Sequence, residues 1–208
     1  MSNKKAQVRL PLTWAILSQG RRVVASMEVG GYVMWLGLAV SFLFLCRASE
    51  LPAYANGQVH PEFCLTRNCL SFTKEYRSHS RTDRPPQQRR QNFLASKSDQ
   101  KRAGCTITRT RLVNDRETGC ASMGAFETLL KLPNVHPQLP EGAPLTFRAT
   151  SGGRKVFTRT EAVAALILMV GSSSGDPMQF ALHSRTIGGG TQLAAQGLSE
   201  LQIQRAGR

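Results

Sequence analysis

Acidic side chains are scarce in this sequence. Its 208 residues contain 13 Asp and Glu against 27 Lys and Arg, so the formal net charge is +14. A surplus of this size favours a negatively charged partner, most simply nucleic acid, or else an anionic membrane surface. The alternative is a basic protein that has no such partner.

Paired cysteines are also missing. The chain has five cysteines and no CxxC pair, and an odd number without pairs indicates neither a disulfide framework nor a zinc ribbon. Reduced thiols in a nuclear or cytoplasmic compartment fit best. A zinc site made of His60, Cys64, Cys69 and His79 is an alternative, but the spacing of these residues matches no familiar zinc module.

The sequence contains no Walker motif, no dinucleotide-binding motif and no internal repeat. We therefore expect no cofactor and no small-molecule substrate. A cleavable signal peptide is not expected either, because the apolar patch that follows Lys4, Lys5 and Arg9 is short and interrupted. Residues 1–8 are polar and basic, and we predict a flexible N-terminus there.

One long apolar run dominates what the chain does contain. Residues 29–46 carry no charge, and this length is at the short end for a bilayer span. One interpretation is a single-pass membrane protein with its span at 29–46 and a basic C-terminal domain. The other is a helix buried in a globular core, which would continue unbroken to Arg47 and Glu50 and place those two residues on one face.

Local signals outline the remaining elements. Thr13 is a candidate helix cap, Thr158 and Glu161 form a capping box, and Gly197 suits the end of a helix. Helices are predicted over residues 10–25, 121–131, 162–171, from 183 or 184 to 197, and 198–206.

A basic hairpin is predicted between the helical regions, with one strand at 91–96 and the other at 105–113. Its alternative is a solvated, charged face without a partner. The side chains expected to contact DNA phosphates in this region are Arg89, Arg90, Lys101, Arg102, Arg109 and Arg111.

Three separated patches together resemble the catalytic domain of the tyrosine recombinases, the phage-integrase family, in the form found in eukaryotic mobile elements. The first patch is LCRASEL at residues 45–51, at the end of the apolar run. The second is ASKSD at 95–99, in the basic hairpin. The third is LHSRTIGGGT at 182–191, followed by IQRAGR at 203–208.

The resemblance implies a role for five residues in site-specific DNA recombination and DNA integration. Arg47 would hold the scissile phosphate and Glu50 would orient it. Lys97 and His183 would handle protons, and Arg185 is the arginine nearest to the His-x-x-Arg pattern of the family. In the intact family a tyrosine attacks the phosphodiester and forms a phosphotyrosine, and no metal is required.

Two departures from the family pattern point to an incomplete enzyme. Position 186, where the pattern has arginine, is Thr186, and the two-residue step from His183 to Arg185 turns about 200° around a helix. The tyrosines, Tyr32, Tyr54 and Tyr76, all lie upstream of the place where the family has its nucleophile.

The sequence therefore predicts an α+β, mainly helical fold with a small antiparallel sheet or hairpin, like a tyrosine-recombinase catalytic domain truncated at its C-terminus and covering residues 9–208. Its partner would be DNA, and the resemblance is compatible with a homo-oligomer that assembles on the DNA. The chain alone would be inactive. A third hypothesis is a decayed mobile element that is translated without a maintained role.

Overall fold

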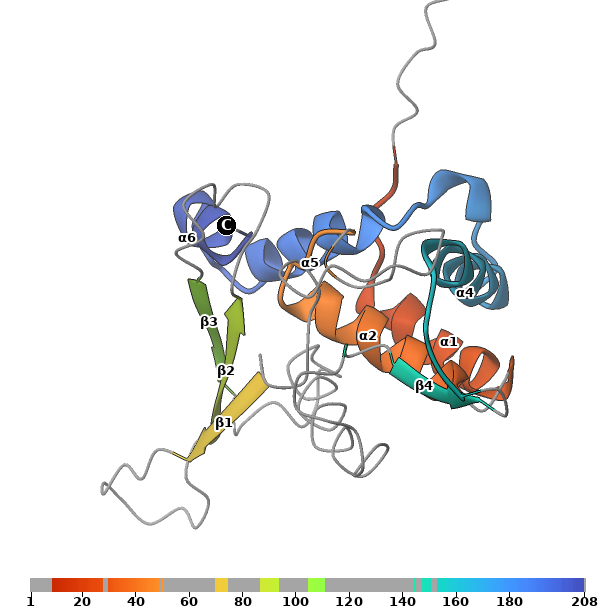
Figure 1. Ribbon diagram of the computed structural model, residues 1–208. Coiled ribbons are helices and arrows are strands. Elements are labelled where there is room, and N and C mark those ends of the chain that lie inside the picture. The colour runs from red at the N-terminus through yellow and green to blue at the C-terminus, as the bar shows by residue number, and fades with distance from the viewer. Residues whose placement is uncertain are drawn as a thin grey trace, which may run out of the picture.

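The computed structural model describes residues 9–27, 30–48, 50, 70–74, 87–93, 105–110, 144, 147–150 and 153–207. Figure 1 labels most of the elements. In chain order they are α1 (Trp14–Met27), α2 (Gly31–Leu43), β1 (Leu70–Lys74), β2 (Gln87–Phe93), β3 (Cys105–Thr110), β4 (Phe147–Thr150), β5 (Gly153–Val156), α4 (Arg159–Ser172), the short 3-10 helix η2 (Pro177–Gln179), α5 (Ser184–Ala195) and α6 (Glu200–Gly207).

Helices make up most of the described chain, which confirms the mainly helical part of the predicted fold. The strands pair antiparallel in two groups, β1-β2-β3 and β4-β5. The second predicted strand, 105–113, overlaps β3, whereas β2 begins at Gln87, four residues before the predicted start at 91. The predicted helix at 121–131 lies outside the described residues.

Helix α2 is the centre of the helical core. Its residues from Val33 to Phe42 are all buried, and Figure 1 shows α2 running between α1 and α5. A helix surrounded by protein must be apolar on every side, which explains the uncharged run in the sequence. Among the described residues, no helix combines the length and the hydropathy that a bilayer span needs.

Helices α1 and α4 cross closely at Gly20. A Cβ atom at this position would lie 2.3 Å from the Cγ of Met169 and 2.9 Å from its Cα. The glycine that weakens α1 as an isolated helix therefore lets α4 pack against it. Helix α1 also contacts α2, where the Trp35 Nε1 donates a hydrogen bond of 2.7 Å to the Leu17 carbonyl.

The predicted start of the first helix at residue 10 is wrong. Leu10 and Leu12 lie before the helix, and their N–H groups donate to the carbonyls of Gln179 (2.8 Å) and Ser184 (2.9 Å). Helix α1 begins at Trp14 because Thr13 caps it, accepting a hydrogen bond of 3.3 Å from the Ile16 N–H. The N-terminal segment thus runs along the chain that leads into α5.

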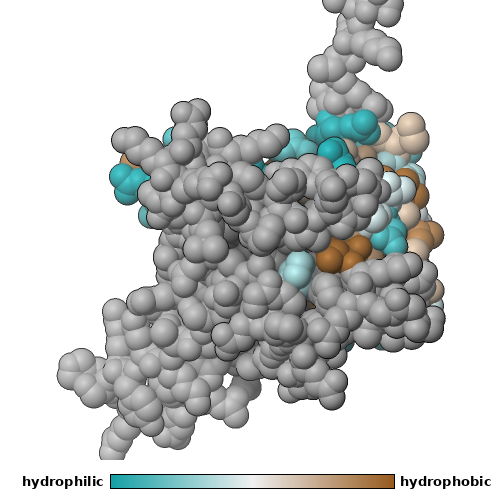
Figure 2. All heavy atoms as spheres, viewed as in Figure 1, coloured by the Kyte–Doolittle hydropathy of each residue, from teal (hydrophilic) through white to brown (hydrophobic). Residues whose placement is uncertain are grey.

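Part of the outer surface is apolar. Ile167 and Leu168 of α4 are 46% and 40% exposed. Figure 2 shows brown, hydrophobic surface on the side of the molecule where Figure 1 draws α4. Isolated apolar residues at a surface are normal in folded proteins, so these two residues need no functional explanation.

Candidate functional site

The site lies just beyond the end of α2. The prediction that this helix continues unbroken to Glu50 is wrong, because α2 ends at Leu43. Two residues later the chain turns sharply at Leu45, whose φ of 53° is in the left-handed region. The turn buries Cys46 and carries Arg47 off the helix, so Arg47 and Glu50 do not lie on one helical face.

Two backbone hydrogen bonds close this turn. The Cys46 N–H donates to the Ser41 carbonyl at 2.8 Å, and the Leu45 N–H donates to the Phe42 carbonyl at 3.4 Å. Together they form a Schellman motif, which usually has glycine at the left-handed position. Since leucine occupies that position here, the usual sequence signal for the end of a helix is missing.

Arg47 and Glu50 form a tight turn of their own. The Glu50 carboxylate accepts a hydrogen bond of 2.8 Å from the Arg47 backbone N–H through Oε2. The Glu50 N–H donates in return to the Arg47 carbonyl at 3.0 Å. Glu50 is buried, with 3% of its surface exposed, while Arg47 is half-buried. Glu50 therefore orients the backbone that carries Arg47.

The beginning of α5 meets this turn from the other end of the chain. The Thr186 hydroxyl donates a hydrogen bond of 3.0 Å to the Cys46 carbonyl, across 140 residues of sequence. His183 is exposed at the N-cap position of α5, and its carbonyl accepts from the Thr186 N–H at 3.0 Å. The structure thus brings position 186 next to the residue that precedes Arg47.

Two glycines let α5 approach this closely. A Cβ atom on Gly188 would lie 1.7 Å from the Leu12 carbonyl oxygen, and one on Gly189 would lie 2.2 Å from the Phe42 carbonyl oxygen. Any side chain at these positions would overlap the backbone of the neighbouring segments. The IGGG sequence therefore serves the packing of α5 against α2 and residues 9–12.

Arg185 is completely buried, with no exposed surface. Its Nε donates to the Leu182 carbonyl at 2.9 Å, and its Nη1 donates to the Ser41 hydroxyl of α2. As the helical step implies, it lies on a different side of α5 from the exposed His183. A guanidinium without exposed surface has no access to a phosphate, so this geometry favours a structural role for Arg185.

Burial dominates the electrostatics of Arg185. Desolvation lowers the pKa of its guanidinium from its ordinary value to about 10, although nearby Cys46 and Glu50 act in the opposite direction. Its Nη2 has no hydrogen-bond partner within the described parts of the chain. In the sequence, Ser41 is only a polar residue inside the apolar run, and no local pattern identifies it as the acceptor for Nη1 of Arg185.

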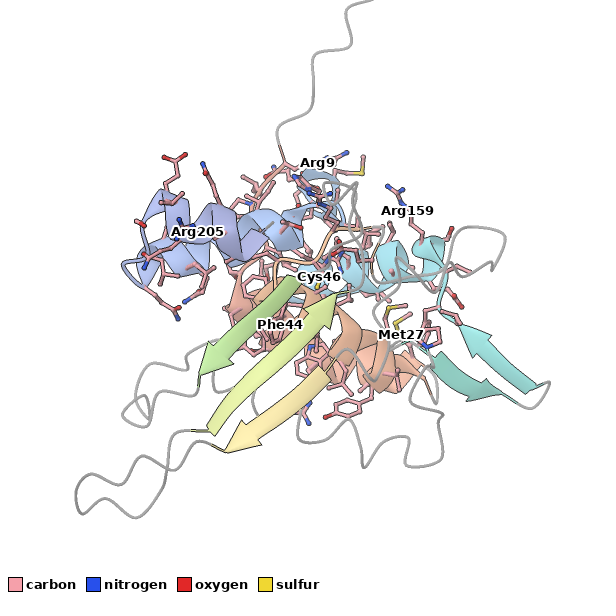
Figure 3. All side chains as sticks on the ribbon, turned by 60° about the vertical axis from the view of Figure 1, so that its left-hand side comes forward. Arg9, Met27, Phe44, Cys46, Arg159 and Arg205 are labelled. Carbon is pink, nitrogen blue, oxygen red and sulfur yellow. The ribbon has the colours of Figure 1, made fainter. Side chains whose placement is uncertain are left out.

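Figure 3 places Cys46 in the middle of the molecule, with Arg205 of α6 on one side and Arg159 of α4 on the other. The Cys46 thiol is buried. The part of the chain that the structure describes holds no group of three or more His, Cys, Asp or Glu that could bind a metal. The residues considered for zinc, His60, Cys64, Cys69 and His79, lie outside that part.

Three of the predicted DNA-binding residues lie on described strands. Arg89 of β2 pairs in register with Arg109 of β3, and Arg90 pairs with Thr108. Successive residues alternate between the faces of a sheet, so Arg89 and Arg109 share one face and Arg90 belongs to the other. Lys97, Lys101, Arg102 and Arg111 lie outside the described residues.

Comparison of the sequence with protein-family models and with curated proteins gives no match.

Proposed function

We propose that this chain is a DNA-binding domain of the tyrosine-recombinase type that holds a backbone phosphate at Arg47 but does not complete strand cleavage. The proposal is supported by the three sequence patches that resemble tyrosine recombinases and by one geometric observation. The two patches around Arg47 and His183, far apart in sequence, meet through the hydrogen bond between Thr186 and Cys46.

Arg47 is suited to a phosphate because a guanidinium stays charged and donates in a planar fork that matches two phosphate oxygens. Its backbone is held by Glu50 at 2.8 Å, and its side chain is half-buried. His183 is exposed at the start of α5. In this proposal, the Arg47 guanidinium and the His183 imidazole are the two side chains that bind the phosphate.

The same place lacks what cleavage needs. Thr186 contributes a neutral hydroxyl already engaged with the Cys46 carbonyl, and Arg185, the nearest arginine, is buried and bound to Ser41. These 208 residues have no tyrosine after Tyr76. A single guanidinium stabilises the charge of a phosphoryl transition state less than two would, so we expect binding without turnover.

Binding should come mainly from backbone phosphates and depend strongly on salt. With about six phosphate contacts, the affinity should fall roughly 10³-fold between about 50 mM and 200 mM salt. Fluorescence anisotropy with a labelled duplex measures this directly, and a scrambled duplex tests for sequence preference, of which we expect little. An affinity that hardly changes over this salt range contradicts the proposal.

A second experiment concerns chemistry. Incubation of the full chain with a nicked duplex, followed by denaturing electrophoresis, should show no covalent protein–DNA adduct. A covalent adduct that survives denaturation would show that a nucleophile in this chain attacks the phosphodiester, which contradicts the view that the site only binds.

A further inference from the structure

A second hairpin carries the same charge pattern as the strands assigned to DNA. Strands β4 and β5 pair antiparallel with Arg148 directly opposite Lys155 and Ala149 opposite Arg154. In β2 and β3, Arg89 lies directly opposite Arg109. Each of the two separate sheets therefore has a pair of basic residues at directly opposite register positions on neighbouring strands.

Such pairs are unfavourable in the protein alone. Like charges directly opposite each other destabilise an antiparallel pair, and a hairpin of four-residue strands has little stability to spare. No acidic residue lies opposite either cation in the register of β4 and β5. Arg159 adds a further exposed cation at the start of α4.

The hairpin is nevertheless held firmly to the core at its C-terminal end. Phe157, which directly follows β5, is buried in the main hydrophobic cluster. Thr158 and Glu161 then close a capping box, with the Glu161 carboxylate accepting from the Thr158 N–H at 2.7 Å. The basic pair of β4 and β5 therefore has a fixed attachment to α4.

We propose that the β4–β5 hairpin is a second contact for the phosphate backbone of duplex DNA, with Arg148 and Lys155 as the contacting residues. In Figures 1 and 3 the two sheets lie apart, on different sides of the helical core. A small anion neutralises one such pair, whereas a duplex carries phosphates along its whole length and can reach both. The inference rests on the proposed DNA binding and extends it to this hairpin.

The test compares the salt dependence of duplex binding by the full chain and by Arg148→Gln/Lys155→Gln. Losing two phosphate contacts should make the slope of log affinity against log salt less negative by about 1.8, and should lower the affinity at 100 mM salt roughly 60-fold. The matched control is Arg22→Gln/Arg205→Gln, which removes two exposed helical charges and should keep the wild-type slope.

A further variant separates binding from folding. Lys155→Glu places opposite charges in register with Arg148, so the thermal midpoint should rise while the DNA affinity falls. The exchange Arg148→Lys/Lys155→Arg, which keeps both charges, should retain the wild-type slope.

The outcomes distinguish this inference from the proposed function. Salt-dependent binding by the wild type, with a hairpin variant indistinguishable from the Arg22→Gln/Arg205→Gln control, overturns the hairpin contact alone. Wild-type binding that is independent of salt overturns both. Preferential binding to vesicles of phosphatidylcholine and phosphatidylserine, lost in the hairpin variant, would assign the hairpin to membranes and overturn the DNA contact.

Discussion

The hydrogen bond between Ser41 and Arg185 offers a quantitative test of how α5 is attached to α2. Desolvation lowers the pKa of Arg185 from its ordinary value to about 10, and a shift of this size corresponds to about 3 kcal/mol for keeping the guanidinium charged in the core. Replacement by methionine regains this cost but loses two hydrogen bonds of the charged group, together about 4 kcal/mol. We expect Arg185→Met to lower the free energy of unfolding by about 1 kcal/mol.

Ser41→Ala should cost more than Arg185→Met, although it removes a single oxygen. It leaves the buried cation without its hydroxyl acceptor, a loss of about 2 kcal/mol. In the double variant that cation is gone, so its stability should be close to that of Arg185→Met alone, with a coupling of about 2 kcal/mol. Urea unfolding followed by the fluorescence of the core-packed Trp14 and Trp35 measures all three.

Ser172→Ala is the matched control. Ser172 donates to the Met169 carbonyl three residues back at 2.8 Å, just as Ser41 donates to Leu38 at 2.8 Å, but no arginine binds it among the described residues. We expect a change below about 0.5 kcal/mol. If Arg185→Met costs more than Ser41→Ala and the two effects add, the guanidinium is not held as described.

Three further predictions follow from the same structure. Because the pKa of Arg185 is lower in the folded state, the unfolded chain binds more protons than the folded chain above about pH 10. The stability of the wild type relative to Arg185→Met should therefore rise with pH from there towards the ordinary pKa of arginine, by at most about 1.4 kcal/mol per pH unit in urea unfolding. Gly188→Ala should lower the free energy of unfolding by several kcal/mol or prevent folding, since its Cβ would overlap the Leu12 carbonyl at 1.7 Å. Gly171→Ala, whose Cβ would have nothing within 4 Å, should instead raise the free energy of unfolding by about 0.5–1 kcal/mol. Equal effects of the two variants in circular-dichroism melts would contradict the close packing of α5. Thr158→Ala removes the hydroxyl that accepts from the Glu161 N–H at 3.3 Å, and it should lower the free energy of unfolding by about 1 kcal/mol in the same melts. An unchanged thermal midpoint would mean that this cap does not stabilise α4.

Elements with local end signals could be predicted well from the sequence. The capping box at Thr158 and Glu161 begins α4, as its residues indicate. Gly197, with φ of +84°, follows the last residues of α5 as expected for a glycine that ends a helix. In both cases the hydrogen-bonding groups lie within a few residues of each other, so the short-range pattern contains the necessary information.

Where the predictions were wrong or incomplete, the local sequence carried no signal for the structure that forms. The first helix begins at Trp14 and not at residue 10 because the backbone of residues 10 and 12 is hydrogen-bonded to residues 179 and 184. Helix α2 ends at Leu43 through a Schellman motif that lacks its usual glycine. The burial of Arg185 depends on Ser41, 144 residues away, and no local pattern indicates such a partner.

The most direct test of the proposed phosphate site at Arg47 is the duplex affinity of Arg47→Lys. This variant keeps the charge but loses the planar fork of donors, so the salt slope should stay the same while the affinity falls about 10-fold, the equivalent of about 1.4 kcal/mol. Arg159→Lys, at an exposed position of α4, should bind like the wild type. If Arg47→Lys also binds like the wild type, Arg47 does not hold a phosphate.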